Sequence, residues 1–364
     1  MTHIAAVAAI AAVTTFTALP ARADIKIFKD WLVGCDNTRT CRAIGSVSGD
    51  PNSTATAQHL VITRAAGADA PVTMHFALRV GKSGGRALVT IDALGARVAG
   101  LPVTLKSEED ANNDQFATLR SDNPKHTAAV VAALRTAKGI QIAAAGETGV
   151  VSLDGATAAL LYIDEVQRRL NTPTALARPG KKPVESIPPA PLMPAVTLDR
   201  TPAAQEPDAK LGERLRAHLR ALPAERRGSV ARELLSSPFK DPRDEVTSLG
   251  GRDVLVKLEH SRGAYNVNAV FYRVPNGDVR RAERIRFPGI TPKDAREVLV
   301  NAGYDAKERM IGYFSKERGL GDCGSSGRYG WTGKSFVLVE YSSMPNCEGV
   351  WSDLWPTLYR ATVK

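Results

Sequence analysis

Nine prolines lie between residues 172 and 208, and this density limits what the chain can fold into more than any other feature. Proline lacks a backbone N–H and fixes φ, so neither a continuous helix nor a central strand can run through such a segment. An extended, semi-rigid chain is favoured instead. We therefore predict a linker here, with a domain on each side. The prolines are Pro173, Pro179, Pro183, Pro188, Pro189, Pro191, Pro194, Pro202 and Pro207.

At 364 residues, the chain is long enough for two domains of ordinary size. Its 43% hydrophobic and 24% charged residues are typical of a globular protein. We predict an α+β fold of two β-rich domains, built from antiparallel sheets or sandwiches with a few packed helices. The predicted division is a signal peptide at 1–23, an N-terminal domain ending in a helix at 24–171, the linker at 172–208, a helical connector at 209–236 and a C-terminal domain at 237–364.

The first residues resemble an export signal. Residues 4–19 are an apolar run, and Ala21, Arg22 and Ala23 give the small-x-small pattern that signal peptidase needs. We expect cleavage before Asp24 and a periplasmic or secreted protein. No lysine or arginine precedes the run, so an uncleaved anchor stays the alternative, although a membrane-spanning helix needs about 20 residues. No later apolar stretch reaches that length without charges, so no transmembrane segment is expected in the mature chain.

Export to an oxidising compartment favours disulfides over free thiols. The four cysteines allow three pairings. Proximity favours Cys35–Cys41 and Cys323–Cys347, whose loops would stabilise the fold by about 2.4 and 3.5 kcal/mol in the chain-entropy model. The crossed pairings stay open and would join the two ends of the chain. Neither pair has Cys-x-x-Cys spacing or a histidine close by, so no metal site is predicted.

Alternating apolar residues predict strands in the N-terminal half, and helical spacing predicts two helices after them. The strands are expected at 25–35, 42–47, 59–64, 72–80 and 87–91, and the helices at 124–138 and from about 154 to 170. In the second helix, Arg168 and Arg169 would suit the negative end of the helix dipole.

The C-terminal half is predicted to open with helices at 211–222 and 224–235. Strands are expected at 253–258, 264–274, 310–314 and 335–341. Pro275, Asn276, Gly277 and Asp278 predict a hairpin turn, with a return strand at 279–287. A capped helix is expected from Thr291, with its buried face formed by Ala295, Val298, Leu299 and Ala302 and its end at Gly303.

Several short motifs together resemble one exported bacterial family, that of domain of unknown function 1176. The resemblance covers nearly the whole mature chain. The first half is also similar, more weakly, to the invasion-associated locus B proteins. The resemblance to the first family implies an exported location and disulfides, and it implies no reaction. The motifs are Phe-Lys-Asp-Trp at 28–31, Cys35-Asp36-Asn37 with Cys41, Ser-Leu-Asp-Gly at 152–155, Ala-Leu-Leu-Tyr-Ile-Asp at 159–164 with Gln167 and Arg168, Ala264-Tyr265-Asn266 after Gly263, Arg-Gly-Leu-Gly-Asp-Cys-Gly at 318–324 and Trp-Pro-Thr-Leu at 355–358.

No motif predicts a catalytic or cofactor site. Residues 319–324 match the dinucleotide pattern GxGxxG, but that pattern needs a helix after it, and residues 325–330 are expected to be a loop. The six histidines show no HExxH or HxH spacing. Val47 occupies the place of serine in the one candidate for a GxSxG elbow, residues 45–49. We predict no catalytic residue, no cofactor and no metal.

The charge pattern favours an anionic partner. The net charge is +10, and it becomes +9 once Arg22 is removed with the signal. Outside the inner membrane the available polyanions are lipid headgroups, lipopolysaccharide phosphates and acidic polymers, so nucleic acid is not expected. Four arginines of the predicted hairpin arm are candidate anion-binding residues, and three of them would share one strand face. A solvated edge kept charged against aggregation is the alternative. The four are Arg280, Arg281, Arg284 and Arg286.

The sequence therefore favours a non-catalytic binding or interaction module that meets an anionic envelope component or another periplasmic protein. The alternative is a periplasmic hydrolase-type enzyme with a site assembled from distant residues. A pocket that joins Asp322 or Glu340 to a histidine would favour the enzyme.

Overall fold

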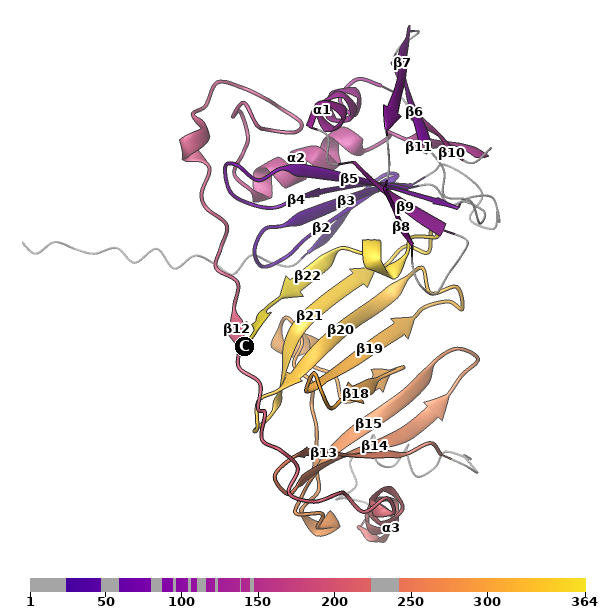
Figure 1. Cartoon of the computed structure of the whole chain (residues 1–364), viewed down its shortest axis with the longest axis vertical. Helices are drawn as coiled ribbons and strands as arrows, with labels where there is room; N and C mark the ends of the chain where they lie inside the picture. The colour runs from indigo at the N-terminus through magenta and orange to yellow at the C-terminus, as the bar shows by residue number, and fades with distance from the viewer. Residues whose placement is uncertain are drawn as a thin grey trace, which may run out of the picture.

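The computed structural model describes residues 24–46, 59–79, 87–93, 96–103, 106–109, 116–121, 124–137, 139–144, 147–223 and 242–364. Within these ranges the chain is an α+β protein with several antiparallel sheets and three α-helices, as the sequence predicts. Figure 1 shows the sheets in succession along the long axis, with the N-terminal sheets at one end and α3 at the other. The predicted signal peptide and the predicted helix at 224–235 lie outside the described residues.

Two sheets and two helices form the N-terminal half. The first sheet has the strand order β1-β2-β3-β4-β5-β9-β8, and the second has the order β11-β10-β6-β7. The strands of the first sheet are β1 (Ile25–Phe28), β2 (Trp31–Cys35), β3 (Cys41–Ser46), β4 (His59–Arg64), β5 (Val72–Arg79), β9 (Phe116–Ser121) and β8 (Lys106–Glu109). The other elements are β11 (Glu147–Ser152), β10 (Gly139–Ala144), β6 (Ala87–Ala93), β7 (Ala96–Val103), α1 (Pro124–Ala133) and α2 (Ala156–Val166).

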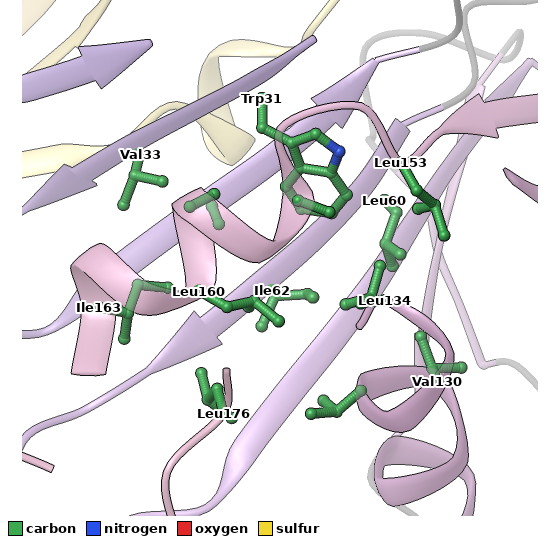
Figure 2. Packing of buried hydrophobic residues seen from close by; sticks show 14 of the residues in the cluster. Trp31, Val33, Leu60, Ile62, Val130, Leu134, Leu153, Leu160, Ile163 and Leu176 are labelled. Atoms are coloured by element: carbon green, nitrogen blue, oxygen red, sulfur yellow. The ribbon is translucent and has the colours of Figure 1, made fainter. Parts of the chain in front are cut away.

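The first core lies between one face of the first sheet and the two helices, as Figure 2 shows. Trp31 is fully buried there, and its indole Nε1 donates to the carbonyl of Ser152 at 2.9 Å. Successive side chains of a strand point to opposite faces. Leu60 and Ile62 therefore pack with the helices, whereas the residue between them, Val61, faces away from this core.

The C-terminal half is a sandwich of two further sheets. One has the order β13-β14-β15-β16, with β17 also paired to β15, and the other has the order β18-β19-β20-β21-β22. Phe271 and Phe287 on one side meet Trp331 and Phe336 on the other in their common core. The strands are β13 (Glu245–Gly250), β14 (Asp253–Arg262), β15 (Val267–Pro275), β16 (Glu283–Arg284), β17 (Leu299–Val300), β18 (Gly303–Asp305), β19 (Met310–Lys316), β20 (Gly324–Trp331), β21 (Phe336–Met344) and β22 (Thr357–Arg360).

Helix α3 (Leu211–Ala221) covers the outer face of β14 and β15. Leu211, Leu215 and Leu219 are buried against that sheet, which is the stripe that their spacing predicts. Arg216 is also buried, and the cost of burying its charge is offset because its guanidinium binds both carboxylate oxygens of Asp244 at 2.6 Å.

The proline-rich segment is extended and lies along both halves of the molecule. In Figure 1 it runs down one side, from the neighbourhood of α2 towards α3. Leu176 belongs to the first core, and Leu198 packs with Met310 and Val339 on the outer face of the last sheet. A short strand within the segment, β12 (Ala195–Val196), pairs in parallel with β23 (Thr362–Val363). The segment is thus part of the packed structure.

The two halves are in contact along a surface that we call the seam. Leu32, Ile44 and Val61 of the first sheet pack against Met344, Val350, Leu354 and Trp355. Polar bonds surround these apolar contacts. The guanidinium of Arg42 donates to the carbonyls of Asp353 and Trp355, both at 2.8 Å. Both faces of β2, β3 and β4 are therefore covered, one by helices and the other by the seam.

The structure corrects four predicted elements. The segment 25–35 is two strands, because the chain turns at Lys29, whose φ is 52°. Residues 325–330 belong to strand β20 and are not a loop. The strand predicted at 279–287 is instead a 3-10 turn, η2 (Val279–Arg281), followed by the two-residue strand β16. The fourth correction concerns the helix predicted after Thr291.

The capping box of Thr291 and Asp294 is present, but it starts only the 3-10 turn η3 (Pro292–Asp294). The residues that follow are extended, and Leu299 and Val300 pair with β15. Val298 packs towards α3, whereas Leu299 packs into the core between the sheets. A strand can place neighbouring residues on opposite faces, and here both faces are covered, so tertiary packing overrides the helical spacing.

Candidate functional site

The predicted arginine arm is irregular rather than a strand face. Asp278 ends the hairpin turn and caps η2, because its carboxylate accepts from the backbone N–H of Arg280. The guanidinium of Arg280 also donates to both carboxylate oxygens of Asp278 at 2.9 Å. This pairing lowers the pKa of Asp278 to about 2. Because 279–281 is a 3-10 turn, Arg280, Arg284 and Arg286 do not share a strand face as predicted.

The four arginines of the arm differ in their partners. Arg280 pairs with Asp278, and Arg284 pairs with Glu297 at 2.8 Å. Arg281 and Arg286 are exposed, and neither has a carboxylate partner among the residues that the structure describes. The arm therefore presents two exposed guanidinium groups that form no salt bridge among the described residues, although Arg281 lies close enough to Asp278 to help lower the pKa of its carboxyl.

A fifth arginine, Arg296, stands out by its surroundings. Its guanidinium donates to the hydroxyl of Tyr313 at 2.9 Å and to that of Tyr341 at 3.4 Å. It also lies over both rings, 5.1 Å and 5.4 Å from their centroids. No sequence motif pointed to this residue, because its partners lie on separate strands, 17 and 45 positions away.

The cysteines form two disulfides, Cys35–Cys41 and Cys323–Cys347, which is the local pairing. The first closes a turn in which the carboxylate of Asp36 accepts from the backbone N–H groups of Thr38 and Thr40. The carboxylate of Glu317 lies within 4.8 Å of both sulfurs of the second disulfide. A disulfide offers no thiolate, so these three residues do not form a metal site of the thiolate kind in the oxidised protein.

A buried polar group lies at the seam beside the second disulfide. Asp322 is 3% exposed, and its carboxylate accepts from Arg318 at 2.7 Å and from the N–H of Gly349 at 2.6 Å. These bonds hold the pKa of Asp322 below its usual value despite its burial. Across the seam, the hydroxyl of Ser46 donates to Glu348.

His59 completes this group and is 1% exposed. It lies against the backbone of Glu348 and Gly349, but neither ring nitrogen makes a hydrogen bond of normal geometry. Burial lowers its pKa to about 4, so the imidazole is neutral at neutral pH.

These contacts bear on the hydrolase alternative. Asp322 is near His59, yet its carboxylate is used by Arg318 and Gly349. Glu340 is exposed on β21, opposite Arg328 and Arg360 in register. In the described part of the chain neither acid makes a hydrogen bond to a histidine, so the nucleophile–base–acid relay of a hydrolase is not assembled around them.

The glycine motif at 319–324 lies in the turn between β19 and β20. Strand β20 begins at Gly324, so no helix N-terminus faces the motif. The motif therefore lacks the feature by which a dinucleotide pyrophosphate would be bound. An open cleft lies along β18, but its lining mixes Asp305 and Glu308 with Lys307 and Arg328 and favours neither sign of charge.

The fold and these surfaces define a β-rich, disulfide-bonded protein with a basic arm and an arginine–tyrosine cluster. The chain belongs to the family described as Protein of unknown function (DUF1176), which matches residues 25–362. The family recognised from the motifs is thus confirmed. No helix in the described ranges is both long and apolar enough to cross a membrane.

Two known proteins are similar to this chain. The Escherichia coli (strain K12) protein described as uncharacterized protein YpfG is 28% identical over 350 residues, covering 92% of each chain. The crystal structure of invasion associated protein B from Bartonella henselae matches 40% of this chain and 98% of its own, with 18% identity and a TM-score of 0.29.

Proposed function

We propose that this protein is a non-catalytic binding module of the bacterial envelope and that its arginine arm contacts an anionic envelope component. The observation that supports this most is that Arg281 and Arg286 are exposed and form no salt bridge among the described residues. An anion that binds them has no internal ion pair to break. Guanidinium groups form short, charge-assisted hydrogen bonds with phosphate and carboxylate oxygens.

The proposal includes export to the periplasm, with a signal peptide at 1–23 cleaved before Asp24. Two disulfides and no free cysteine among the described residues are typical of proteins in oxidising compartments. The net charge, +10 for the whole chain and +9 once Arg22 is removed with the signal, adds a long-range attraction to anionic surfaces. A hydrolase stays the alternative, and the use of Asp322 in structural bonds favours the binding role over it.

Charge reversal tests the arm directly. We expect the protein to sediment with vesicles of phosphatidylglycerol and phosphatidylcholine, and the bound fraction to fall as salt screens the contacts. The double variant Arg281→Glu, Arg286→Glu should weaken this binding more than about tenfold, because each basic residue near an anionic membrane contributes about 1 kcal/mol.

The matched control is the double variant Lys181→Glu, Lys182→Glu. It makes the same change in net charge at two exposed residues of the proline-rich segment. If both double variants lose the same affinity, net charge and not the arm is responsible. If the wild-type protein does not bind anionic vesicles better than phosphatidylcholine alone, an anionic lipid surface is excluded as the ligand.

A protein partner is the second binding hypothesis. A crosslinking experiment distinguishes a protein partner from an anionic envelope component. The protein is crosslinked in its own periplasmic and membrane fractions and then purified at low and at high salt. A discrete crosslinked protein together with no vesicle binding would replace the anionic component by a protein. A protein recovered as a clean monomer, with no vesicle binding, would favour the enzyme.

A further inference from the structure

A row of tyrosines crosses the inner face of the last sheet. Tyr313, Gly327, Tyr341 and Tyr359 are register partners on the adjacent strands β19, β20, β21 and β22. Residues directly opposite each other on neighbouring strands point to the same face. Gly327 interrupts the row, and a Cβ there would lie 2.6 Å from the ring of Tyr313. The row thus has a gap between Tyr313 and Tyr341.

The guanidinium of Arg296 lies at this gap, over the rings of both Tyr313 and Tyr341. Besides the two tyrosine hydroxyls, it donates to the hydroxyl of Ser325 at 3.3 Å. Its backbone is held by two reciprocal hydrogen bonds with Phe287, each 2.8 Å long. The side chain is half-buried, so solvent reaches part of it.

The charge of Arg296 is not neutralised within the described residues, where all of its partners are neutral hydroxyls and aromatic rings. Burial raises the pKa of Tyr313, and it raises that of Tyr329 to about 12. Both tyrosines are therefore neutral at neutral pH, and the cluster carries a net positive charge.

Arg296 leaves its Nε without a partner among the described residues, and Nε is half of the edge that binds carboxylates elsewhere in this protein. Arg216, Arg280 and Arg318 each bind both oxygens of a carboxylate with the Nε and Nη2 edge. Arg296 instead donates both bonds of Nη1, and one bond of Nη2, to hydroxyls. Of its five N–H donors, that on Nε and one on Nη2 have no partner in the described part of the chain.

We propose that Arg296 binds the carboxylate or phosphate group of a small ligand through its Nε and Nη2 edge, with the tyrosine row as the wall of the site. The two parallel N–H groups of this edge match the spacing of two oxygens of a carboxylate or of a phosphate. The site goes beyond the proposed function, because none of the four arginines of the arm contributes to it and its ligand is a small molecule rather than a surface.

Nuclear magnetic resonance of isotope-labelled full-length protein tests this site through the Nε–H signal of Arg296, which is assigned by its absence from Arg296→Lys. The probes are glucuronate, inorganic phosphate and, as the neutral control, glucose. We expect a saturable shift of this signal with at least one of the two anions and none with glucose. A response to only one anion identifies which oxyanion the site prefers.

Arg296→Gln, followed through the backbone amide signals that shift in the wild type, should weaken anion binding at least about tenfold, because a hydrogen-bonded charge contact is lost. Arg296→Lys keeps the positive charge but loses the paired Nε and Nη2 donors, so its affinity for the anion should lie between those of the wild type and of Arg296→Gln. It replaces Arg296→Gln in the test if that variant does not fold. Arg328→Gln is the matched control. Arg328 follows Gly327 on β20, so its side chain points to the face of the last sheet opposite to the tyrosine row. This variant should bind like the wild type.

Three results would overturn the proposal. The first is an Nε–H signal that neither anion moves, and the second is an equal shift with glucose. The third is a loss of affinity in Arg328→Gln as large as that in Arg296→Gln, which would place the anion in the cleft along β18.

Discussion

A single buried histidine makes the seam sensitive to acid. His59 lies on β4, directly opposite Ser46 on β3, and the backbone of Glu348 and Gly349 covers its ring. Its nitrogens are buried without hydrogen bonds of normal geometry. A proton on this ring would therefore be a charge that the surrounding groups do not solvate well.

We predict that stability falls on acidification because of His59. Its pKa is about 4 in the folded protein, against about 6.5 in the unfolded chain. Between these values the unfolded chain binds the proton and the folded protein does not, so the free energy of unfolding decreases as the pH falls through this window. The full effect is about 3 kcal/mol, and it is absent above the unfolded pKa.

Urea unfolding across this pH range checks the effect. The variant His59→Leu should show a shallower decrease than the wild type, whatever its stability at neutral pH. His218→Leu, which changes a partly exposed histidine of α3, should keep the wild-type slope. Parallel curves for the wild type and His59→Leu would assign the acid sensitivity to other groups.

At the scale of elements, α3 shows how one stripe of leucines anchors a helix. The stripe packs on β14 and β15, and the buried ion pair of Arg216 with Asp244 ties the helix to the residues just before β13. Glu213 lies on the opposite, exposed face.

We predict that Leu215→Ala lowers the free energy of unfolding by about 2–5 kcal/mol, because it removes a fully buried side chain and leaves a cavity. Glu213→Gln should change it by less than about 1 kcal/mol. Thermal and urea unfolding measure both. A cost for Leu215→Ala no larger than that for Glu213→Gln would mean that α3 is not packed on the sheet in solution.

For the whole molecule, the seam joins residues about three hundred positions apart into one packed surface. The second disulfide holds one side of it, because Cys347 lies next to Glu348 and Gly349, which contact Ser46 and Asp322. Gly34 lies so close to Pro356 that a Cβ would be 2.5 Å from the proline ring. Close packing of this kind favours unfolding of the two halves as one unit.

We predict that the variant Cys323→Ser, Cys347→Ser loses about 3.5 kcal/mol of stability, and Cys35→Ser, Cys41→Ser about 2.4 kcal/mol, as the loop lengths require. Only the first should speed hydrogen exchange at Ile44 and Val61, which face the seam. Equal protection of these two amides in both variants would show that the disulfide loop does not hold the seam closed.

Local patterns predicted much of the fold. The proline density implied an extended segment, the leucine spacing implied α3, and sequence proximity implied the two disulfides. The prediction after Thr291 was wrong because Val298 and Leu299 serve two different cores, which helical spacing cannot reveal.

The candidate sites were less accessible from the sequence. The arginine arm was recognised from its composition, but the capping by Asp278 that changes its shape depends on the backbone of the turn. Arg296 was missed, because its environment arises only when three strands and the segment after β16 meet.

The seam also determines when the protein can finish folding. A chain that is made from its N-terminus exposes Leu32, Ile44 and Val61 long before residues 344–355, which cover them, have been synthesised. Until then the first sheet has one face packed against the helices and one apolar face exposed to solvent. Exposed apolar surface on a partly folded chain favours aggregation. The synthesis of residues 344–355 thus acts as a closing step, and a nascent chain that stalls before them would depend on a chaperone to cover that face.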